Sequence, residues 1–103
     1  MKNAPYPIDL SVMQTTLKDH RQSIGKETGR HHYANEVGLI NFAITGKHKS
    51  CIRELNISRK LLKVIERIVC ENIKLIKLHV TYKDRKKYCR NLFLQISTSE
   101  IKN

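Results

Sequence analysis

Cysteine is scarce in this chain, and the three cysteines lie far apart. Cys51, Cys70 and Cys89 are an odd number with no close pair, which argues against a disulfide framework and favours a reducing compartment. No Cys-x-x-Cys motif occurs, so the ligand spacing typical of structural zinc sites is missing. We predict that Cys70 and Cys89, which fall among apolar residues in helical segments, are small core side chains.

Long hydrophobic runs and catalytic motifs are also missing. No apolar run approaches the roughly 20 residues that span a bilayer, and residues 1–7 contain no hydrophobic signal region. We therefore predict a cytoplasmic protein without membrane contact. Neither a glycine-rich phosphate loop nor a nucleophile motif is present, so we predict that the protein is not an enzyme and uses no cofactor.

Acidic residues are few relative to basic ones. The 103 residues include 20 Lys and Arg against 9 Asp and Glu, a formal net charge of +11. A chain of this length forms one small domain with a limited core. A charge excess of this size favours polyanionic partners: nucleic acid, an acidic protein surface or an anionic membrane. The plain alternative is a solvated basic surface that binds nothing.

Helical periodicity, in contrast, runs through most of the sequence. Apolar residues recur about every 3.6 positions in four segments, which are residues 11–24, 33–45, 58–78 and 82–96. We therefore predict an all-α fold, a small four-helix bundle whose third helix is central and the longest of the four. Ser11 and Thr81 are predicted to begin helices, and Gly46 is predicted to end one. Residues 1–10 are predicted to form an extended tail, 25–32 a loop, and 97–103 a frayed tail.

Strands remain an alternative for two segments. Residues 73–82 are rich in Ile, Val, Thr and Tyr, and residues 92–97 alternate between apolar and polar side chains. Because the helical period covers more of the chain, we expect at most a small β element.

Two polar residues interrupt the apolar stripes of the last two helices. Asn72 lies on the stripe of the third helix, and Arg85 lies on the stripe that Tyr82 begins in the fourth. A buried polar group costs stability unless its hydrogen bonds are satisfied. Glu36 is a natural partner for Arg85, and Asn41 for Asn72. The four residues form either a buried cluster that fixes helix register or a set placed at the solvent boundary.

The same region carries a resemblance to a known family. The residues that carry it are scattered over positions 33–92: Tyr33-Ala34, Glu36, Leu39-Ile40-Asn41, Gly46, Ile52-Arg53, Leu61-Leu62, Glu66, Asn72, Leu75-Ile76 and Tyr82-x-x-Arg85. This pattern resembles the C-terminal region of phage antirepressor-like proteins, including proteins that carry an N-terminal KilA-N domain. The resemblance implies a phage, prophage or mobile-element origin and a regulatory or host-directed role. It does not extend to the KilA-N domain, so it transfers no DNA-binding site.

Histidines supply one candidate metal-binding pattern. His31, His32 and Glu36 lie close together in the sequence, with His20 as a further candidate. Two imidazoles and a carboxylate can hold zinc or carry out general-acid chemistry. Solvated histidines near the start of a helix explain the same residues, and we therefore predict no metal site.

Basic residues form the most persuasive functional pattern. Lys83, Lys86, Lys87 and Arg90 lie at i, i+3, i+4 and i+7, which predicts one cationic face on the fourth helix. Such a face neutralises phosphates without reading bases. Aromatic residues are only 6% of the chain, which favours backbone binding over base stacking. The predicted nucleic-acid-binding residues are Lys83, Lys86, Lys87, Arg90, Lys47, Lys49, Arg53, Arg59 and Lys60.

Two functions therefore compete. The first is a small regulatory protein that binds nucleic acid, with DNA favoured over RNA, through a cationic helix face. The second is an interaction protein that docks on an acidic host or phage protein, such as a repressor or a defence complex. A homodimer is compatible with both.

Overall fold

Four helices make up the described part of the fold. The computed structural model describes residues 10–46 and 58–102, with side chains up to residue 98. The helices are α1 (Ser11–Ser23), α2 (Arg30–Thr45), α3 (Arg59–Lys77) and α4 (Tyr82–Lys102). The predicted all-α class and small helical bundle are confirmed, and no strand occurs in the described part of the chain.

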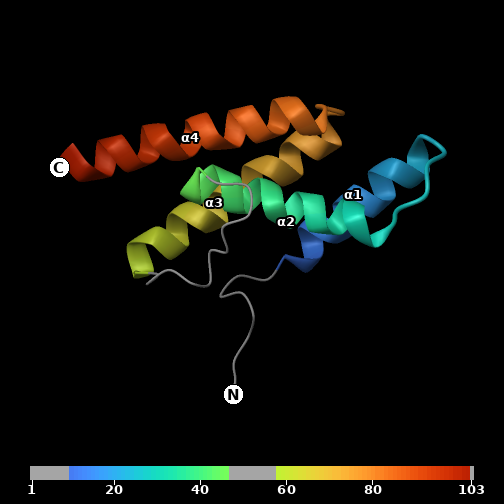
Figure 1. The fold of residues 1–103 in the computed structure, drawn as a ribbon, viewed down its shortest axis with the longest axis horizontal. Coiled ribbons are helices and arrows are strands. Elements are labelled where there is room, and N and C mark those ends of the chain that lie inside the picture. The colour runs from blue at the N-terminus through green and yellow to red at the C-terminus, as the bar shows by residue number, and fades with distance from the viewer. Residues whose placement is uncertain (1–9, 47–57, 103) are drawn as a thin grey trace, which may run out of the picture.

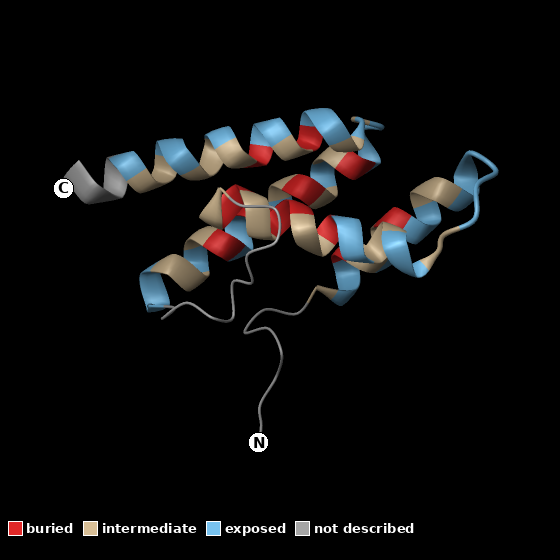
Figure 2. Ribbon diagram, viewed as in Figure 1, coloured by how far each residue is buried: buried red, intermediate tan, exposed pale blue. Residues whose placement is uncertain are grey.

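The third helix packs against each of the other three, and α2 does so as well, so α3 shares the central place with α2. α3 and α4 form a hairpin, α4 also packs along α2, and α1 lies against α3 (Figure 1). Buried positions on the helices face the middle of the bundle, while the outer side of α4 is exposed (Figure 2). The core includes Met13 from α1, Leu39 and Ile40 from α2, and Ile65 and Ile68 from α3.

The two helices of the first half follow local signals in the sequence. Leu10 is the N-cap of α1, so Ser11 is the first helical residue and not the N-cap. α2 begins at Arg30, earlier than the predicted residue 33, because Gly29 is extended and His32 caps the helix start. The Gly29 N–H donates to Nδ1 of His32 at 2.9 Å. α2 ends as predicted at Gly46, which has a left-handed φ of 77°.

The helices of the second half are capped by hydroxyl side chains. The Ser58 hydroxyl accepts from Leu61 N–H at 3.0 Å, and the Thr81 hydroxyl accepts from Asp84 N–H at 3.3 Å. The prediction that the third helix is the longest is wrong: among the described helices α4 is the longest, with 21 residues against 19 in α3. Residues 97–102 continue α4 where the sequence predicted a frayed tail, since no Gly or Pro follows Thr81. The predicted tail at 1–9 and the segment 47–57 lie outside the described residues.

The described cysteines differ in environment. Cys89 is fully buried, as predicted, whereas Cys70 is exposed on α3 and the core role predicted for it is wrong. The reason is helix phase: Val69 and Asn72 face the core, whereas Cys70 lies on the opposite side of the helix from Asn72. Burial raises the pKa of the Cys89 thiol to about 12.

We expect this difference to appear as thiol reactivity. In a Cys51→Ser, Cys70→Ser background, Cys89 should resist a thiol reagent at neutral pH, because it is both shielded and protonated. Denaturant should make it react at the rate of a free thiol. In a matched Cys51→Ser, Cys89→Ser background, Cys70 should react without denaturant. Fast labelling of native Cys89 would show that α4 is not packed as described.

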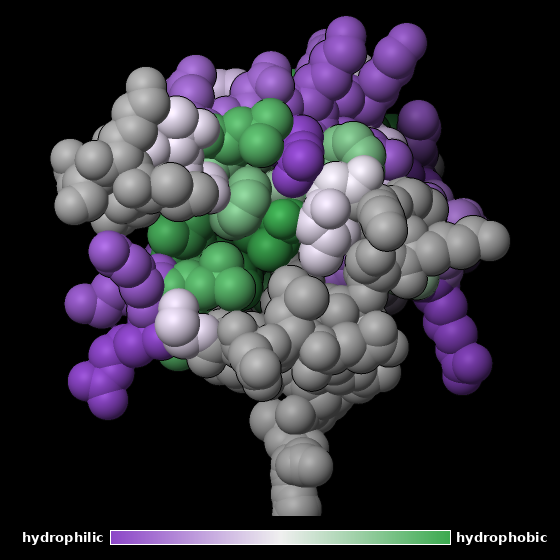
Figure 3. Space-filling model, turned by 60° about the vertical axis from the view of Figure 1, so that its left-hand side comes forward, coloured by the Kyte–Doolittle hydropathy of each residue, from purple (hydrophilic) through white to green (hydrophobic). Residues whose placement is uncertain are grey.

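The small core leaves some apolar side chains at the surface. Figure 3 shows a face on which such side chains gather among hydrophilic ones. Leu61, Leu92, Phe93 and Ile96 pack against the core but are only half-buried, and Leu94 is 43% exposed. Single apolar side chains exposed in this way are normal in a small domain, whereas several on one face form a surface that a partner can cover.

Candidate nucleic-acid interface

One buried polar cluster joins all four helices. Glu36 comes from α2, Asn72 from α3 and Arg85 from α4, and Met13 of α1 lies against them. The exposed fractions of Glu36, Asn72 and Arg85 are 2%, 0% and 5%. Asn72 and Arg85 therefore do not lie at the solvent boundary, which was the alternative left open by the sequence.

Arg85 is the hub of this cluster. Its Nη1 donates to Oε1 of Glu36 and, at 3.0 Å, to Oδ1 of Asn72. Its Nη2 donates to Oε2 of Glu36 at 3.0 Å, and its Nε donates to the Val80 carbonyl at 3.1 Å. The Asn72 amide then donates to Oε1 of Glu36 at 3.0 Å and to the Met13 sulfur at 3.3 Å. A two-pronged arginine–carboxylate pair of this kind fixes both distance and orientation.

The polar side chains next to the cluster make hydrogen bonds to the backbone. Tyr82 donates from its hydroxyl to the Asn35 carbonyl at 3.2 Å, and burial, followed by the Glu36 charge, raises the pKa of Tyr82. Asn41, the partner predicted for Asn72, is half-buried, and its carbonyl accepts from the Thr45 hydroxyl. With Glu36 held between Arg85 and Asn72, the cluster is suited to setting helix register rather than to proton transfer.

The four cations predicted to share one outer face of α4 are separated in the structure. Lys83 and Lys87 are exposed, but Lys86 and Arg90 are half-buried and lean over α2. Nζ of Lys86 lies 4.6 Å from the centre of the Phe42 ring. Arg90 donates from Nη1 to the Ala43 carbonyl at 3.1 Å. The prediction of one continuous outward face fails because α4 packs on both α2 and α3, which buries a wider arc than the apolar stripe alone suggests.

Arg90 has a capping role at the end of α2. Its guanidinium passes so close to Gly46 that a Cβ built there would lie 2.8 Å from Nη2. A cation that bonds a carbonyl in the last turn of a helix also interacts favourably with the helix dipole.

We therefore expect Arg90→Ala to lower the free energy of unfolding by about 1 kcal/mol, the usual contribution of one such hydrogen bond. Lys87→Ala, which alters an exposed side chain on the same helix, is the matched control and should change stability by less than about 0.5 kcal/mol. Denaturant unfolding followed by circular dichroism measures both. Equal midpoints would show that the contact with Ala43 contributes nothing.

The outer side of α3 carries the longest array of exposed cations. Five basic residues lie on one side of this helix and are all exposed: Arg59, Lys63, Arg67, Lys74 and Lys77. We call these five residues the α3 stripe. They are three, four or seven positions apart, so at about 100° per residue they fall within an arc of roughly 80°. Lys60 lies exposed beside the stripe, at the start of the helix.

The α3 stripe faces away from the core. The buried residues of α3, among them Ile65, Ile68 and Asn72, occupy the opposite side of the helix. From Arg59 to Lys77 the stripe extends roughly 27 Å at 1.5 Å per residue. Acidic residues barely interrupt it: Glu66 is exposed at its edge, and Glu71 pairs with Lys74 at 3.1 Å.

The predicted phosphate-binding residues do not lie on one surface of the structure. Arg59 and Lys60 lie at one end of α3, while Lys83 and Lys87 lie on the separate outer face of α4. The predicted sites Lys47, Lys49 and Arg53 lie outside the described residues. Lys63, Arg67, Lys74 and Lys77 were not among the predicted sites, although their helical spacing was the signal that could have found them.

The histidines of α2 do not gather around a metal site. His32 caps the helix start, His31 lies against it with ring centres 3.9 Å apart, and Glu36 bonds Arg85 and Asn72. Within residues 10–46 and 58–102 there is no group of three or more His, Cys, Asp or Glu side chains placed to hold a metal ion.

None of the helices in the described part of the chain is both long and apolar enough to cross a bilayer. Comparison of the chain with protein-family models, with curated proteins and with solved structures finds no match.

Proposed function

We propose that this protein binds nucleic acid by laying the α3 stripe along a phosphate backbone. The observation that supports the proposal is the placement of five exposed cations on one arc of α3, opposite its buried side. A helix face of this kind neutralises phosphates and releases counterions, which gives affinity with little dependence on base sequence. Duplex DNA is the favoured ligand because the stripe contains no aromatic side chain on which an unpaired base could stack.

The biological setting follows from the resemblance to phage antirepressor-like proteins. In that setting the chain is a small cytoplasmic regulatory protein of a phage, a prophage or another mobile element, and it has no catalytic task. The α3 stripe supplies the contact with nucleic acid that the resemblance alone does not transfer. The buried cluster ties α3 to α2 and α4 through Asn72, which bonds Glu36 and Arg85.

A second candidate is an acidic protein target. The cations of the α3 stripe serve either ligand, and the half-buried apolar residues Leu92, Phe93 and Ile96, with exposed Leu94, add a surface of the kind that protein partners cover. A homodimer would also cover this surface.

Direct titration separates these candidates. Labelled duplex and single-stranded DNA of random sequence are titrated with the protein at near-physiological salt, and anisotropy is recorded. We expect duplex binding with a Kd of about 10⁻⁴–10⁻⁶ M that weakens steeply as salt is raised. No binding at protein concentrations up to about 10⁻³ M, ten times the weakest Kd expected for a non-specific DNA-binding protein, would exclude the nucleic-acid proposal and favour the acidic protein target.

A further inference from the structure

A basic hollow lies where the end of α1, the α3–α4 turn and the start of α4 meet. Its volume is about 360 Å³, which is within the range of small-ligand pockets. No Asp or Glu of the described chain lines this hollow. Five basic side chains line it instead: His20, Arg21, Lys26, His79 and Arg85.

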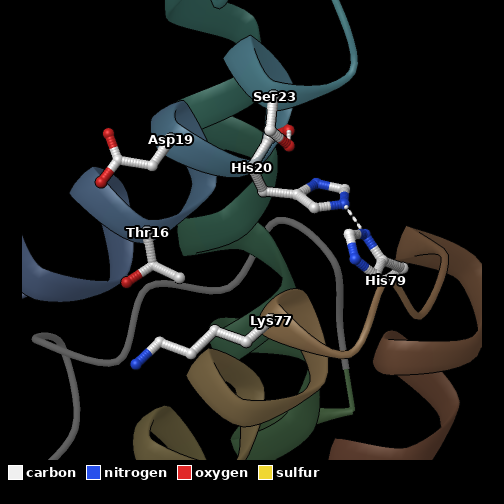
Figure 4. A pocket seen from close by; sticks show the side chains of 6 residues that line it. All are labelled: Thr16, Asp19, His20, Ser23, Lys77 and His79. Carbon is white, nitrogen blue, oxygen red and sulfur yellow. Dashed lines mark hydrogen bonds between the residues drawn. The ribbon is translucent and has the colours of Figure 1, made fainter.

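Two histidines meet at the edge of the hollow. Nε2 of His20 lies 2.7 Å from Nδ1 of His79, although the residues are 59 positions apart in the sequence. Figure 4 shows this contact from the neighbouring hollow, where His20 comes from α1 and His79 from the turn after α3. At this distance one imidazole donates a hydrogen bond and the other accepts it, so at least one of the two rings is neutral.

The backbone of His79 has an unfavourable conformation. His79 has a φ of 64°, and it is the one non-glycine residue with positive φ in the described part of the chain. It follows the C-cap Leu78, and the Val80 N–H donates to the Leu75 carbonyl at 3.0 Å. Glycine is favoured at this position after a helix. The chain places an imidazole there instead, and strained residues of this kind concentrate at functional sites.

The electrostatics of the hollow favour an anion over a cation. Burial lowers the pKa of His20, and the charges of His79, Arg85 and Arg21 lower it further. The same charges attract an anion and repel a metal ion. Arg85 is paired with Glu36, and Nε and Nη2 of Arg21 donate to the Glu27 carbonyl. The attraction for an anion therefore comes from the charges of Arg21 and Lys26 and from whichever histidine of the pair is protonated.

One side of the hollow is lined by apolar and aromatic side chains, against which an organic group could pack. Ile24 and Val80 line it with apolar surface, and Tyr82 contributes an aromatic ring. Ile24 is 49% exposed, which is high for a residue of its size and leaves it available to a ligand. Cationic side chains beside an apolar and aromatic wall match a phosphate joined to a flat, weakly polar group.

We propose that this hollow binds a phosphomonoester, with the phosphate among His20, His79, Arg21 and Lys26 and the organic group against Ile24, Val80 and Tyr82. A phosphomonoester carries close to two negative charges at neutral pH, whereas each internal phosphate of a strand carries one. The source is a free nucleotide or the terminal phosphate of a nucleic-acid strand. The proposal stands apart from the α3 stripe, although the last stripe residue, Lys77, lines the hollow on the other side of the histidine pair.

Binding should be linked to protonation of the histidine pair. The charged and titratable groups around the pair come from every adjoining element: Asp19 and Arg21 of α1, Lys26 of the following loop, Lys77 of α3, and Tyr82 and Arg85 of α4. A bound dianion stabilises the imidazolium form, so it raises the pKa of His20 and takes up a proton. Affinity should therefore rise as the pH falls from about 7.5 towards about 6, where the dianionic ligand itself takes up a proton and becomes a monoanion.

The test uses the full chain, with inorganic phosphate and adenosine monophosphate as probes. The ring C–H signals of the histidines are followed by ¹H–¹³C NMR during each titration. Both probes should shift the signals of His20 and His79 and leave those of His31 in place, and the pKa of His20 should rise. His79→Gly, which suits the backbone conformation, and His20→Gln should each weaken binding about tenfold or more, a typical loss for one charge-assisted hydrogen bond. His31→Gln is the control and should bind as the wild type does.

A comparison of DNA strands that end in a 5′-phosphate with DNA strands that end in a 5′-hydroxyl identifies the source of the phosphate. Tighter binding of the 5′-phosphate strand, lost in His79→Gly, indicates a strand end. Binding of the mononucleotide without any such preference indicates a free nucleotide. Histidine signals that do not move with either probe at about 1 mM, or a His79→Gly variant with unchanged affinity, would overturn the proposal. Because the mononucleotide needs no contact with the α3 stripe, failure of duplex binding would leave this result unaffected.

Discussion

Arg85→Ala is expected to lower the free energy of unfolding by about 3–5 kcal/mol, the usual cost of breaking a buried ion pair. The substitution leaves Glu36 charged at 2% exposure and removes a donor to Asn72. A domain of this size has a total stability of only about 5–15 kcal/mol, so the variant should melt far below the wild type or fail to fold. Lys87→Ala, on the exposed side of the same helix, is the control and should shift the midpoint little.

A double-mutant cycle shows whether the loss comes from the pair itself. Glu36→Ala alone should also cost several kcal/mol, because it leaves Arg85 charged at 5% exposure. The Glu36→Ala, Arg85→Ala double variant should cost clearly less than the sum of the two single losses, since no charge is then left buried without its partner. Chemical denaturation of the four proteins gives the coupling energy. Additive losses would mean that the two residues act independently, contrary to the geometry.

The sequence was sufficient to predict the helices and three members of the buried cluster, Glu36, Asn72 and Arg85. A period of about 3.6 identified all four helices, and hydroxyl and glycine residues marked several of their ends. Asn72 and Arg85 stood out because each interrupts an apolar stripe, and the structure places both with Glu36. Periodicity locates the buried side of a helix, so it also identifies a polar residue that lies on that buried side.

Contacts between distant elements were not predictable in the same way. Lys86 and Arg90 look solvent-facing in the periodicity of α4, but they lie over α2 because that helix packs alongside. The contact of His20 with His79 depends on a turn with positive φ, for which a histidine gives no signal in the sequence. Met13 joins the cluster through its sulfur, and the sequence marks it only as an apolar residue.

Replacement of four of the five α3-stripe cations is expected to weaken duplex DNA binding on the order of a hundredfold at physiological salt. The variant replaces four exposed cations by a neutral residue of similar helix propensity: Lys63→Gln, Arg67→Gln, Lys74→Gln and Lys77→Gln. If each cation contacts one phosphate, the slope of log K against log salt should become shallower by about 3.6, or about 0.9 per contact. The far-UV circular dichroism spectrum should stay that of a helical protein, since none of these side chains is buried.

A control variant of equal charge separates a defined interface from a general effect of net charge. It carries four other substitutions at exposed cations: Lys18→Gln, Arg30→Gln, Lys83→Gln and Lys87→Gln. Both variants lose the same number of positive charges, so a protein that binds through its overall field would weaken equally in both. Binding that depends on the α3 stripe weakens mainly in the stripe variant, because counterions are released only where cations meet phosphates. The opposite result, a larger loss in the control, would move the interface to Lys83 and Lys87 on α4, the face that the sequence alone favoured.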